Sequence, residues 1–288
     1  MAASGPIMLR RHVALRLKGL RLKAKLERED VATHLRCSLS HVTQLETKRA
    51  LPKPSEVRDL LPLYGAADQT EAFLDLVDNA KRGREWWEPY KGAAPEWLDL
   101  MLSMEAGAAQ IESYDAMIVP GLGQTPAYAR QVITIGEPDL PEPDVTSRVN
   151  LRMARQDVLT RQPNPPAVLS ILDESVLDRL PGDDPAVMVE QLQQLLKLTE
   201  LPTVTFRIQS KRRVTAGMEG TFTVVTFPAE LIDDPGVAYT ETRVDAEYHE
   251  DPVKVRRYRD TLARIKASAY SPEESRTVLV RRIEELTS

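Results

Sequence analysis

Between residues 26 and 54 the apolar side chains follow the spacing of two short helices joined by a tight turn, and this pattern constrains the fold more than any other feature of the chain. In the first helix Val31 and Leu35 are four residues apart, so both side chains point to one face. Ala32 lies beside them, and its small side chain allows a second helix to cross closely at a steep angle. Two short helices in such a crossing form a helix-turn-helix.

The second of these helices has the composition of a helix that is presented to a partner. Val42 and Leu45 are apolar and three residues apart, while polar side chains occupy its other faces. Ser38 precedes the helix at the N-cap position, where its hydroxyl can accept a free backbone N–H of the first turn. In a helix-turn-helix the second helix lies in the major groove of DNA, so we expect a DNA-binding domain.

Charge is distributed unevenly along the 288 residues, which are enough for two domains with a core in each. The whole chain has a net charge of −5, yet residues 1–54 contain 12 Lys or Arg and 4 Asp or Glu. Their net charge of +8 leaves −13 for the rest of the chain. The phosphate backbone of double-stranded DNA would attract the first segment and repel the remainder.

Simple counts disfavour several other classes of protein. Cys37 is the only cysteine, which excludes an intramolecular disulfide and indicates a reducing, cytoplasmic environment. The N-terminus has no apolar run of the length that a signal peptide needs. Since no window approaches about 18 uninterrupted apolar residues, we expect no membrane partner and no membrane span.

The chain also lacks the residue spacings of common catalytic and metal sites. Three of its four histidines lie in the N-terminal segment, and no Cys/His set has metal-ligand spacing. A Ser-His-Asp arrangement would need His249, which nothing in the sequence orients. Asp173 and Glu174 could act as paired carboxylates, but neighbouring residues point in different directions, so we expect them to place negative charge at a helix start. We therefore expect no catalytic residue, no metal, no cofactor and no enzyme activity.

A cluster of aromatic residues marks the expected boundary between two domains. Trp86, Trp87 and Trp97 are the three tryptophans of the chain and fall within twelve residues, next to proline and glycine. Such a cluster either joins two domains or anchors a partner or ligand. We predict a helix-turn-helix domain over residues 1–84 and an α/β regulatory domain over residues 85–288.

Local patterns predict that the first domain is all-α with five helices and that the second is α/β (α+β), with a mixed sheet of about five strands flanked by helices. In the first domain we expect residues 1–9 to be disordered. Besides the helix-turn-helix, we expect three helices there: one over 10–25, one that begins after a cap at Ser55, and one over 67–82. Basic residues of the first helix, including Arg21, are expected on a solvated face or against phosphates. We expect a parallel connection between the strands 167–172 and 203–208. The other expected strands are 108–114, 116–119, 221–227 and 237–242, and the other helices are 95–106, 145–161, 173–180, 185–198, 252–269 and 272–286.

Two features of the second domain bear on ligand binding. Residues 120–126, Pro-Gly-Leu-Gly-Gln-Thr-Pro, contain a Gly-x-Gly but no complete phosphate-loop pattern. Thr125 as N-cap and Pro126 at the first helical position explain this segment as the start of a helix, and a ligand cradle is the alternative. Arg148, Arg152 and Arg155 lie at helical spacing and could clamp an anion or the DNA backbone, or else pair with the acidic groups of their own domain.

Several residues of the helix-turn-helix occur together in one known family. They are Arg28 and the Asp30-Val31-Ala32 run in the first helix, residues 38–45 in the second, Glu46, and the basic Lys48-Arg49 after it. With these residues the stretch resembles the Xre family of phage-repressor-like DNA-binding domains. It departs from that family at Arg36 and Lys48, where glycine is frequent. A left-handed backbone at Arg36 would cost about 1 kcal/mol.

Further motifs extend the resemblance over nearly the whole chain. In order they are Trp86-Trp87, residues 119–130, Arg152-Met-Ala-Arg-Gln156, Leu172-Asp-Glu174 and residues 271–275. Together they look like the antitoxin-like Xre-family regulators of streptomycetes and related actinobacteria, which carry an uncharacterised C-terminal domain of about this length. Gly123 stands where leucine is more usual. The resemblance implies a transcriptional regulator, in some members paired with a small protein encoded by an adjacent gene.

Helix position and the resemblance together assign roles to individual residues. Five residues of the second helix are expected to face base edges, and the amide of Gln44 can pair bidentately with adenine. Three basic residues would contact phosphates and set the register. The base-reading set is Ser38, Leu39, Ser40, Thr43 and Gln44, the phosphate set is Arg28, Lys48 and Arg49, and the partner or ligand set is Trp86, Trp87, Arg152 and Arg155.

These assignments predict a sequence-specific regulator of transcription. We expect a homodimer that binds a double-stranded operator and whose C-terminal domain senses a ligand or a protein partner. The alternative is an antitoxin-like interaction module that sequesters a small partner protein and binds DNA only secondarily.

Overall fold

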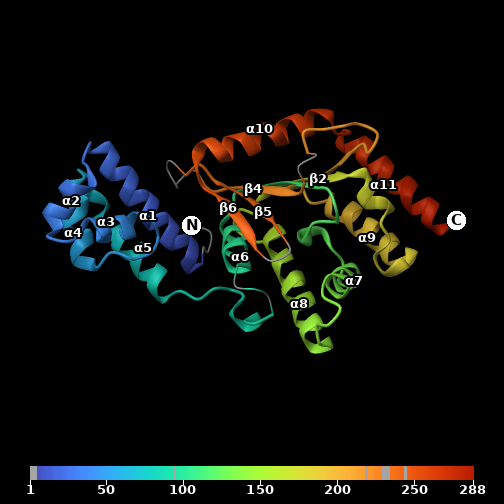
Figure 1. Ribbon diagram of the computed structural model, residues 1–288, viewed down its shortest axis with the longest axis horizontal. Helices are drawn as coiled ribbons and strands as arrows, with labels where there is room; N and C mark the ends of the chain where they lie inside the picture. Colours follow the sequence, from blue (N-terminus) through green and yellow to red (C-terminus); the bar gives the residue numbers. More distant parts are fainter. Residues whose placement is uncertain (1–4, 94, 96, 218–219, 229–233, 243–244) are drawn as a thin grey trace. The chain divides into compact units, whose positions relative to one another are not determined.

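The structure, a computed structural model, describes residues 5–93, 95, 97–217, 220–228, 234–242 and 245–288 (Figure 1). Contacts within the chain divide it into two compact units. Unit 1 comprises Met1–Glu88 and Phe227–Asp234, and unit 2 comprises Pro89–Thr226 and Pro235–Ser288. The first unit thus ends four residues after the predicted boundary and includes a short segment from far along the sequence.

Five α-helices lie in the described part of unit 1, as the sequence predicted. The first begins at Pro6, so the prediction of disorder is wrong for Pro6 to Leu9; residues 1–4 lie outside the described residues. The helix starts there because a proline suits the first turn and Met8 is buried. The helices are α1 (Pro6–Lys23), α2 (Arg28–Leu35), α3 (Leu39–Glu46), α4 (Pro54–Leu63) and α5 (Thr70–Arg82), the last preceded by a 3-10 turn at Ala67–Gln69.

Helix α4 begins differently from the prediction. Ser55 does not cap it, because the helix starts one residue earlier, with Pro54 in the first turn. The backbone N–H of Lys53 donates to the carboxylate of Glu56 at 2.7 Å. The proline and this carboxylate supply the start signal that was assigned to the serine.

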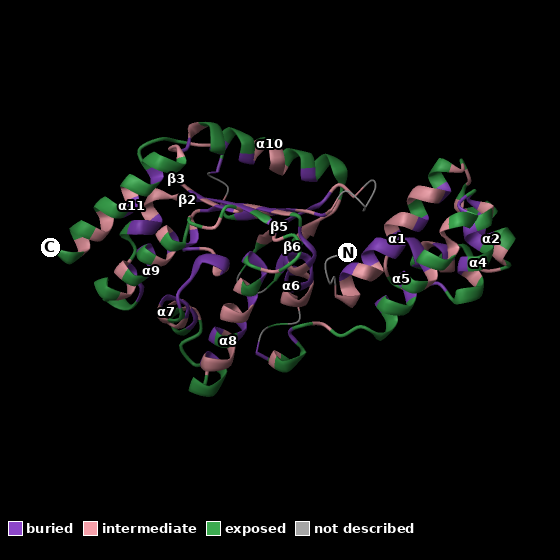
Figure 2. Ribbon diagram, turned by 180° about the vertical axis from the view of Figure 1, so that it is seen from behind, coloured by how far each residue is buried: buried purple, intermediate pink, exposed green. Residues whose placement is uncertain are grey.

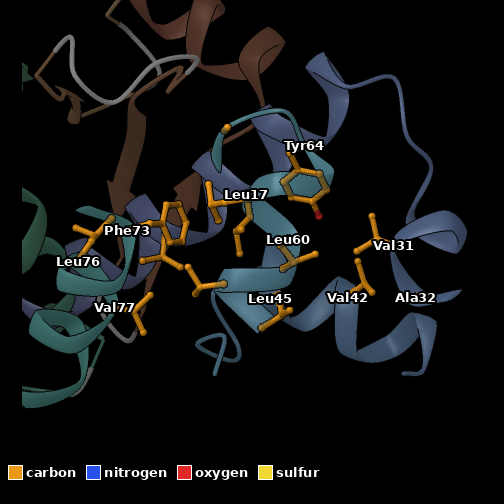
Figure 3. Packing of buried hydrophobic residues seen from close by; sticks show 14 residues of the cluster. Leu17, Val31, Ala32, Val42, Leu45, Leu60, Tyr64, Phe73, Leu76 and Val77 are labelled. Atoms are coloured by element: carbon orange, nitrogen blue, oxygen red, sulfur yellow. The ribbon is translucent and has the colours of Figure 1, made fainter. Parts of the chain in front are cut away.

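All five helices contribute to the core of unit 1. Figure 3 shows the cluster, in which Val31 and Ala32 of α2 meet Val42 of α3. Leu17 of α1 and Phe73 of α5 belong to the same cluster. Val31, Ala32, Val42 and Leu45 are buried as predicted, so the packing of the two helices is confirmed, whereas Leu35 is only partly buried and Glu46 is buried as well.

The described residues of unit 2 form a six-stranded mixed sheet in the order β3-β2-β1-β4-β5-β6. Strands β1, β2 and β3 are parallel, and the others add antiparallel. Five strands match the predicted ones. Segment 116–119 is not a strand, and β6 was missed because this half-exposed edge strand has only four residues. The strands are β1 (Gln110–Asp115), β2 (Ala167–Asp173), β3 (Val204–Gln209), β4 (Phe222–Thr226), β5 (Val237–Glu241) and β6 (Ala246–His249).

Helices cover both faces of this sheet (Figures 1 and 2). One face packs against α10, with Tyr114, Ile171 and Val224 in a common cluster with residues of that helix. On the other side lie α6, α7 and α8, while α11 packs against α9 and β3. The helices are α6 (Leu98–Gly107), α7 (Pro126–Gly136), α8 (Glu142–Arg155), α9 (Pro185–Leu198), α10 (Pro252–Ser268) and α11 (Pro272–Thr287).

Two predicted helices are shorter in the structure. The predicted helix over 145–161 is α8, followed by a 3-10 helix at Gln156–Leu159. The predicted helix over 173–180 is a 3-10 helix at Glu174–Asp178, which Asp173 caps by accepting the N–H of Ser175 at 2.9 Å. That carboxylate therefore serves at a helix start, as the sequence predicted.

Candidate functional site

The N-terminal end of α3 is organised by local interactions. Ser38 has an extended backbone, and its hydroxyl accepts the N–H of His41 at 3.2 Å, which confirms the predicted N-cap. Arg36, in the turn before it, has φ 50° and ψ 45°. Lys48, after the helix, has φ 68°. Both positions at which the resembled family often has glycine are thus left-handed here, at a cost of about 1 kcal/mol each.

A buried ion pair fastens the other end of α3. Glu46, its last residue, faces Arg21 of α1, with Nε–Oε1 at 2.6 Å and Nη2–Oε2 at 3.0 Å. Arg28 of α2 adds a contact from its Nε to Oε2 at 2.8 Å. Burial disfavours the ionised form of the Glu46 carboxylate, but the two guanidinium groups favour it more strongly, so the pKa of Glu46 is lowered. Both neighbouring helices therefore hold the orientation of α3.

Arg21 corrects one sequence prediction. It was expected on a solvated or phosphate-facing surface, but it is 4 % exposed. Its Nη1 donates to the carbonyl of Leu26 at 2.8 Å, and the hydrogen bond to Glu46 raises its pKa. Its position four residues after Leu17, on the apolar face of α1, was the available signal.

The predicted base-reading residues lie together on the accessible side of α3. Leu39 is 44 % exposed, and Ser38, Ser40 and Gln44 are exposed as well. Thr43 is half-buried, and its hydroxyl donates to the carbonyl of Leu39 at 3.0 Å. A polar face is thus presented outward while Val42 and Leu45 hold the helix to the core.

The three predicted phosphate contacts differ in accessibility. Arg49 is exposed, and Lys48 is half-buried. The side chain of Arg28 is 36 % exposed, but its Nε is engaged by Glu46. Arg28 therefore positions α3 in addition to any contact with a phosphate.

The three tryptophans are divided between the units. Trp86 and Trp87 lie in unit 1, in edge-to-face contact with ring centroids 5.7 Å apart. Trp87 is buried and Trp86 is partly exposed. Trp97 lies in unit 2, where its carbonyl accepts the hydroxyl of Tyr248 at 2.8 Å.

Unit 2 contains a cavity of about 160 Å³ on the side of the sheet that α6 and α8 cover. Its floor includes Ser113 and Asp115 of β1, which face the same side because strand residues alternate. The register places Ser170 of β2 and Thr223 of β4 on either side of Ser113. Four polar side chains from three adjacent strands therefore meet at one place.

Two predicted ligand residues, Arg152 and Arg155, line this cavity from α8. Arg155 forms a buried ion pair with Glu105 of α6 at 2.8 Å, the internal pairing that the sequence left as an alternative. Arg152 donates from Nη1 to the amide oxygen of Gln124 at 3.0 Å. Burial, with the nearby charge of Arg155, lowers the pKa of Arg152 to about 10. Arg148 instead pairs with Glu137.

Comparison with known families places both units. A helix-turn-helix domain family matches residues 12–74, and a family described as a domain of unknown function (DUF5753) matches residues 98–281. The chain belongs to the DUF5753 family. The helix-turn-helix match supports a DNA-binding role for unit 1. No curated protein and no solved structure matches the chain.

The DUF5753 region contains the whole cavity, including the glycine-containing loop. Thr125 accepts the N–H of Tyr128 at 3.2 Å, so the predicted helix start is confirmed. Gly121 and Gln124 of the same loop line the cavity, and a Cβ at Gly121 would lie 3.1 Å from Nη1 of Arg155. The loop therefore starts α7 and also forms a cavity wall.

Two kinds of feature are absent from the described residues of this DUF5753 protein. No group of three or more His, Cys, Asp or Glu side chains in the described ranges is arranged to hold a metal ion. Among the helices described, none is both long and apolar enough to cross a membrane.

Proposed function

We propose that this protein is a sequence-specific DNA-binding regulator of transcription and that α3 reads base edges in the major groove. The observation that carries the proposal is the polar, outward face of α3 on a helix fixed by the buried pair of Glu46 and Arg21. A reading helix must be held rigidly and still be accessible, and α3 meets both conditions.

Each side chain has a defined task in this proposal. The amide of Gln44 pairs with an adenine, and Leu39 contacts a thymine methyl. Arg49 and Lys48 bind phosphates, which sets the register without reading sequence. Ser38, Ser40 and Thr43 complete the base-facing surface, and a homodimer would place two copies of it on a palindromic operator.

The experiment is a selection of bound duplexes from a random library with the full chain, followed by footprinting of the selected site and of the region upstream of its own gene. Gln44→Ala should weaken binding to the selected site by about 1–3 kcal/mol and remove the preference for one base at a single position of that site. Binding to random DNA should be unchanged. Asn79→Ala, an exposed amide on α5, is the matched control. An equal loss on selected and random DNA would remove Gln44 from the base-reading set.

A second variant tests the phosphate contacts. Arg49→Ala should weaken binding to all sequences alike and reduce the slope of log affinity against log salt by about 1. Arg82→Ala removes the same charge from α5, which packs on α1 and α4, and should leave the slope unchanged. A slope unaffected by Arg49→Ala would place the backbone contacts elsewhere.

Unit 2 has a sensing role in this proposal, without catalysis of its own. The cavity beneath α6 and α8 supports a small effector. The resemblance to antitoxin-like Xre regulators of actinobacteria supports a second input, a small protein encoded nearby. As a regulator of a bacterial chromosome, the protein would act in the cytoplasm.

The alternative is an antitoxin-like module whose main task is to sequester that small protein. Trp86, exposed beside the buried Trp87, is suited to anchor a protein partner. Co-purification with the product of the adjacent gene, in a fixed ratio and without any footprint on DNA, would favour it. A footprint obtained without that product would favour the regulator.

A further inference from the structure

Asp115 is a buried carboxylate that lacks a cationic partner among the residues the structure describes. It ends β1 on the floor of the cavity and is 5 % exposed. Its Oδ2 accepts the hydroxyls of Ser113 at 2.6 Å and Ser170 at 2.7 Å. Among the described residues no Lys, Arg or His forms an ion pair with it. Burial therefore raises the pKa of Asp115 to about 6, against the effect of the two hydroxyls.

The other charges of the cavity are balanced. Glu105 and Arg155 form a buried ion pair. Arg152 and Glu241, which carry opposite charges, also line the cavity; burial raises the pKa of Glu241, and the charges of Arg155 and Arg152 oppose that rise. The carboxylate of Asp115 is left as the net charge, −1. A ligand with a single positive charge would complement it.

The walls of the cavity limit the body of such a ligand. Ile111, Val168 and Phe206 form an apolar side, and Tyr239 is a further aromatic residue of the lining. Aromatic rings attract organic cations as well as apolar groups. An engineered apolar cavity of about 150 Å³ holds benzene, so a volume of about 160 Å³ suits roughly six to ten non-hydrogen atoms.

We propose that the cavity of unit 2 binds a small organic amine, with its ammonium group on Asp115 and its apolar body against the side formed by Ile111, Val168 and Phe206. This inference deepens the effector-sensing role and rests on it. A neutral alcohol would leave the carboxylate uncompensated. A carboxylate ligand would add a second buried negative charge beside Asp115.

The chain connects this cavity to the DNA-binding unit. Strands β4 and β5 contribute Thr223 and Tyr239 to the cavity, and the segment that joins these strands, Phe227–Asp234, belongs to unit 1. Within unit 1 Asp234 forms a buried ion pair with Arg11 of α1 at 2.7 Å, and the guanidinium lies 5.4 Å from the ring centroid of Phe227. A ligand that alters β4 and β5 would therefore act on Phe227 and Asp234, which contact Arg11 of α1.

The test uses three matched probes with the full chain at pH 7.5: 2-phenylethylamine, 2-phenylethanol and phenylacetate. A second set replaces the phenyl body by a chain: pentylamine, pentanol and pentanoate. Thermal melts and titration calorimetry measure binding. The amines should raise the melting temperature by at least about 2 °C at millimolar concentration, and the alcohols and acids should not.

Asp115→Asn should weaken amine binding tenfold or more, because it removes the charge and leaves the shape. Glu112→Gln makes the same chemical change on the opposite face of β1 and should leave amine binding unchanged. Equal stabilisation by the alcohols or acids, amine binding that survives Asp115→Asn, or no binding of either amine would overturn the proposal.

A separate measurement distinguishes this inference from the regulatory function. The affinity of the wild-type chain for its selected operator is measured with and without the amine that binds. Amine binding without a change in operator affinity would keep the ligand site and reject the sensing role. Specific operator binding without amine binding would reject the ligand site alone.

Discussion

The two units each bury a carboxylate, and the two carboxylates are treated in opposite ways. Glu46 in unit 1 is bound by Arg21 and Arg28, and its pKa is lowered. Asp115 in unit 2 accepts hydrogen bonds from two serine hydroxyls and has no ion-pair partner in the described ranges, and its pKa is raised. Both are almost fully buried, so the difference comes from their partners.

This difference in partners indicates two roles: Glu46 stabilises the fold, whereas Asp115 is available to bind a ligand. A buried charge without a partner is costly, and it persists where function requires it. Glu46 has its partners within the fold and holds α3 in place. Asp115 lines a cavity, so its partner can come from solution. Five variants test this contrast.

The largest effect is expected when Glu46 loses its main partner. Arg21→Ala should lower the free energy of unfolding by about 3–5 kcal/mol, because it leaves a buried carboxylate with Arg28 alone. Urea denaturation of the full chain measures this free energy, and Arg82→Ala, at an exposed position of α5, should change it by less than about 0.5 kcal/mol. A loss below about 1 kcal/mol for Arg21→Ala would show that the pair does not hold α3.

The same ion pair predicts a dependence on acid. The pKa of Glu46 in the folded protein lies below its ordinary value of 4.5. The ion pair therefore contributes fully to stability above pH 4.5, and this contribution is lost as the pH falls through the lowered pKa. Acid titration of unfolding should therefore show a smaller decline in Glu46→Gln than in the wild type.

Asp115→Asn should change the free energy of unfolding in the opposite direction and stabilise the protein. The pKa rises from an ordinary 3.8 to about 6, so the folded state binds the proton more tightly and stability falls as the pH rises through this interval. Removing the charge should increase the free energy of unfolding by about 2–3 kcal/mol at pH 7.5 and by little at pH 4. Glu112→Gln should show no such difference between the two pH values. If Asp115→Asn were less stable than the wild type at pH 7.5, the charge of Asp115 would stabilise the fold as that of Glu46 does, and the contrast between them would be wrong.

Ser38→Ala measures how much the N-cap of α3 contributes to stability, for comparison with the buried ion pair of Arg21 and Glu46. Loss of the hydroxyl that accepts the N–H of His41 should cost about 1 kcal/mol. Thermal unfolding measures this value against Ser40→Ala, an exposed serine of the same helix. A cost equal to that of Arg21→Ala would mean that the cap, and not the buried pair, dominates.

The smallest effect is expected at the turn before α3. Arg36→Gly should increase the free energy of unfolding by about 0.5–1 kcal/mol, since glycine adopts the left-handed backbone at φ 50° without strain. Arg58→Gly, on the exposed side of α4, should decrease it by about 1 kcal/mol. The two changes are chemically identical, so the opposite signs report the backbone alone.

The sequence by itself determined the elements that depend on local spacing and capping. The apolar residues of α2 and α3, the Ser38 and Thr125 caps, and five of the six strands follow from periodicity and from the chemistry of helix ends. These signals lie within a few residues of one another along the chain. The expected left-handed turn at Arg36 belongs to the same class.

Only the tertiary structure decided which charges are paired. Arg21 meets Glu46 across 25 residues of sequence, and Arg155 meets Glu105 across 50, whereas Asp115 meets no cation in the described chain. Helical spacing could indicate that Arg21 is buried, but nothing local names its partner. The local sequence around a carboxylate on a strand or helix is the same whether the group is paired, solvated or facing a cavity. Burial and distance set the pKa of each, and both arise only when strands and helices pack.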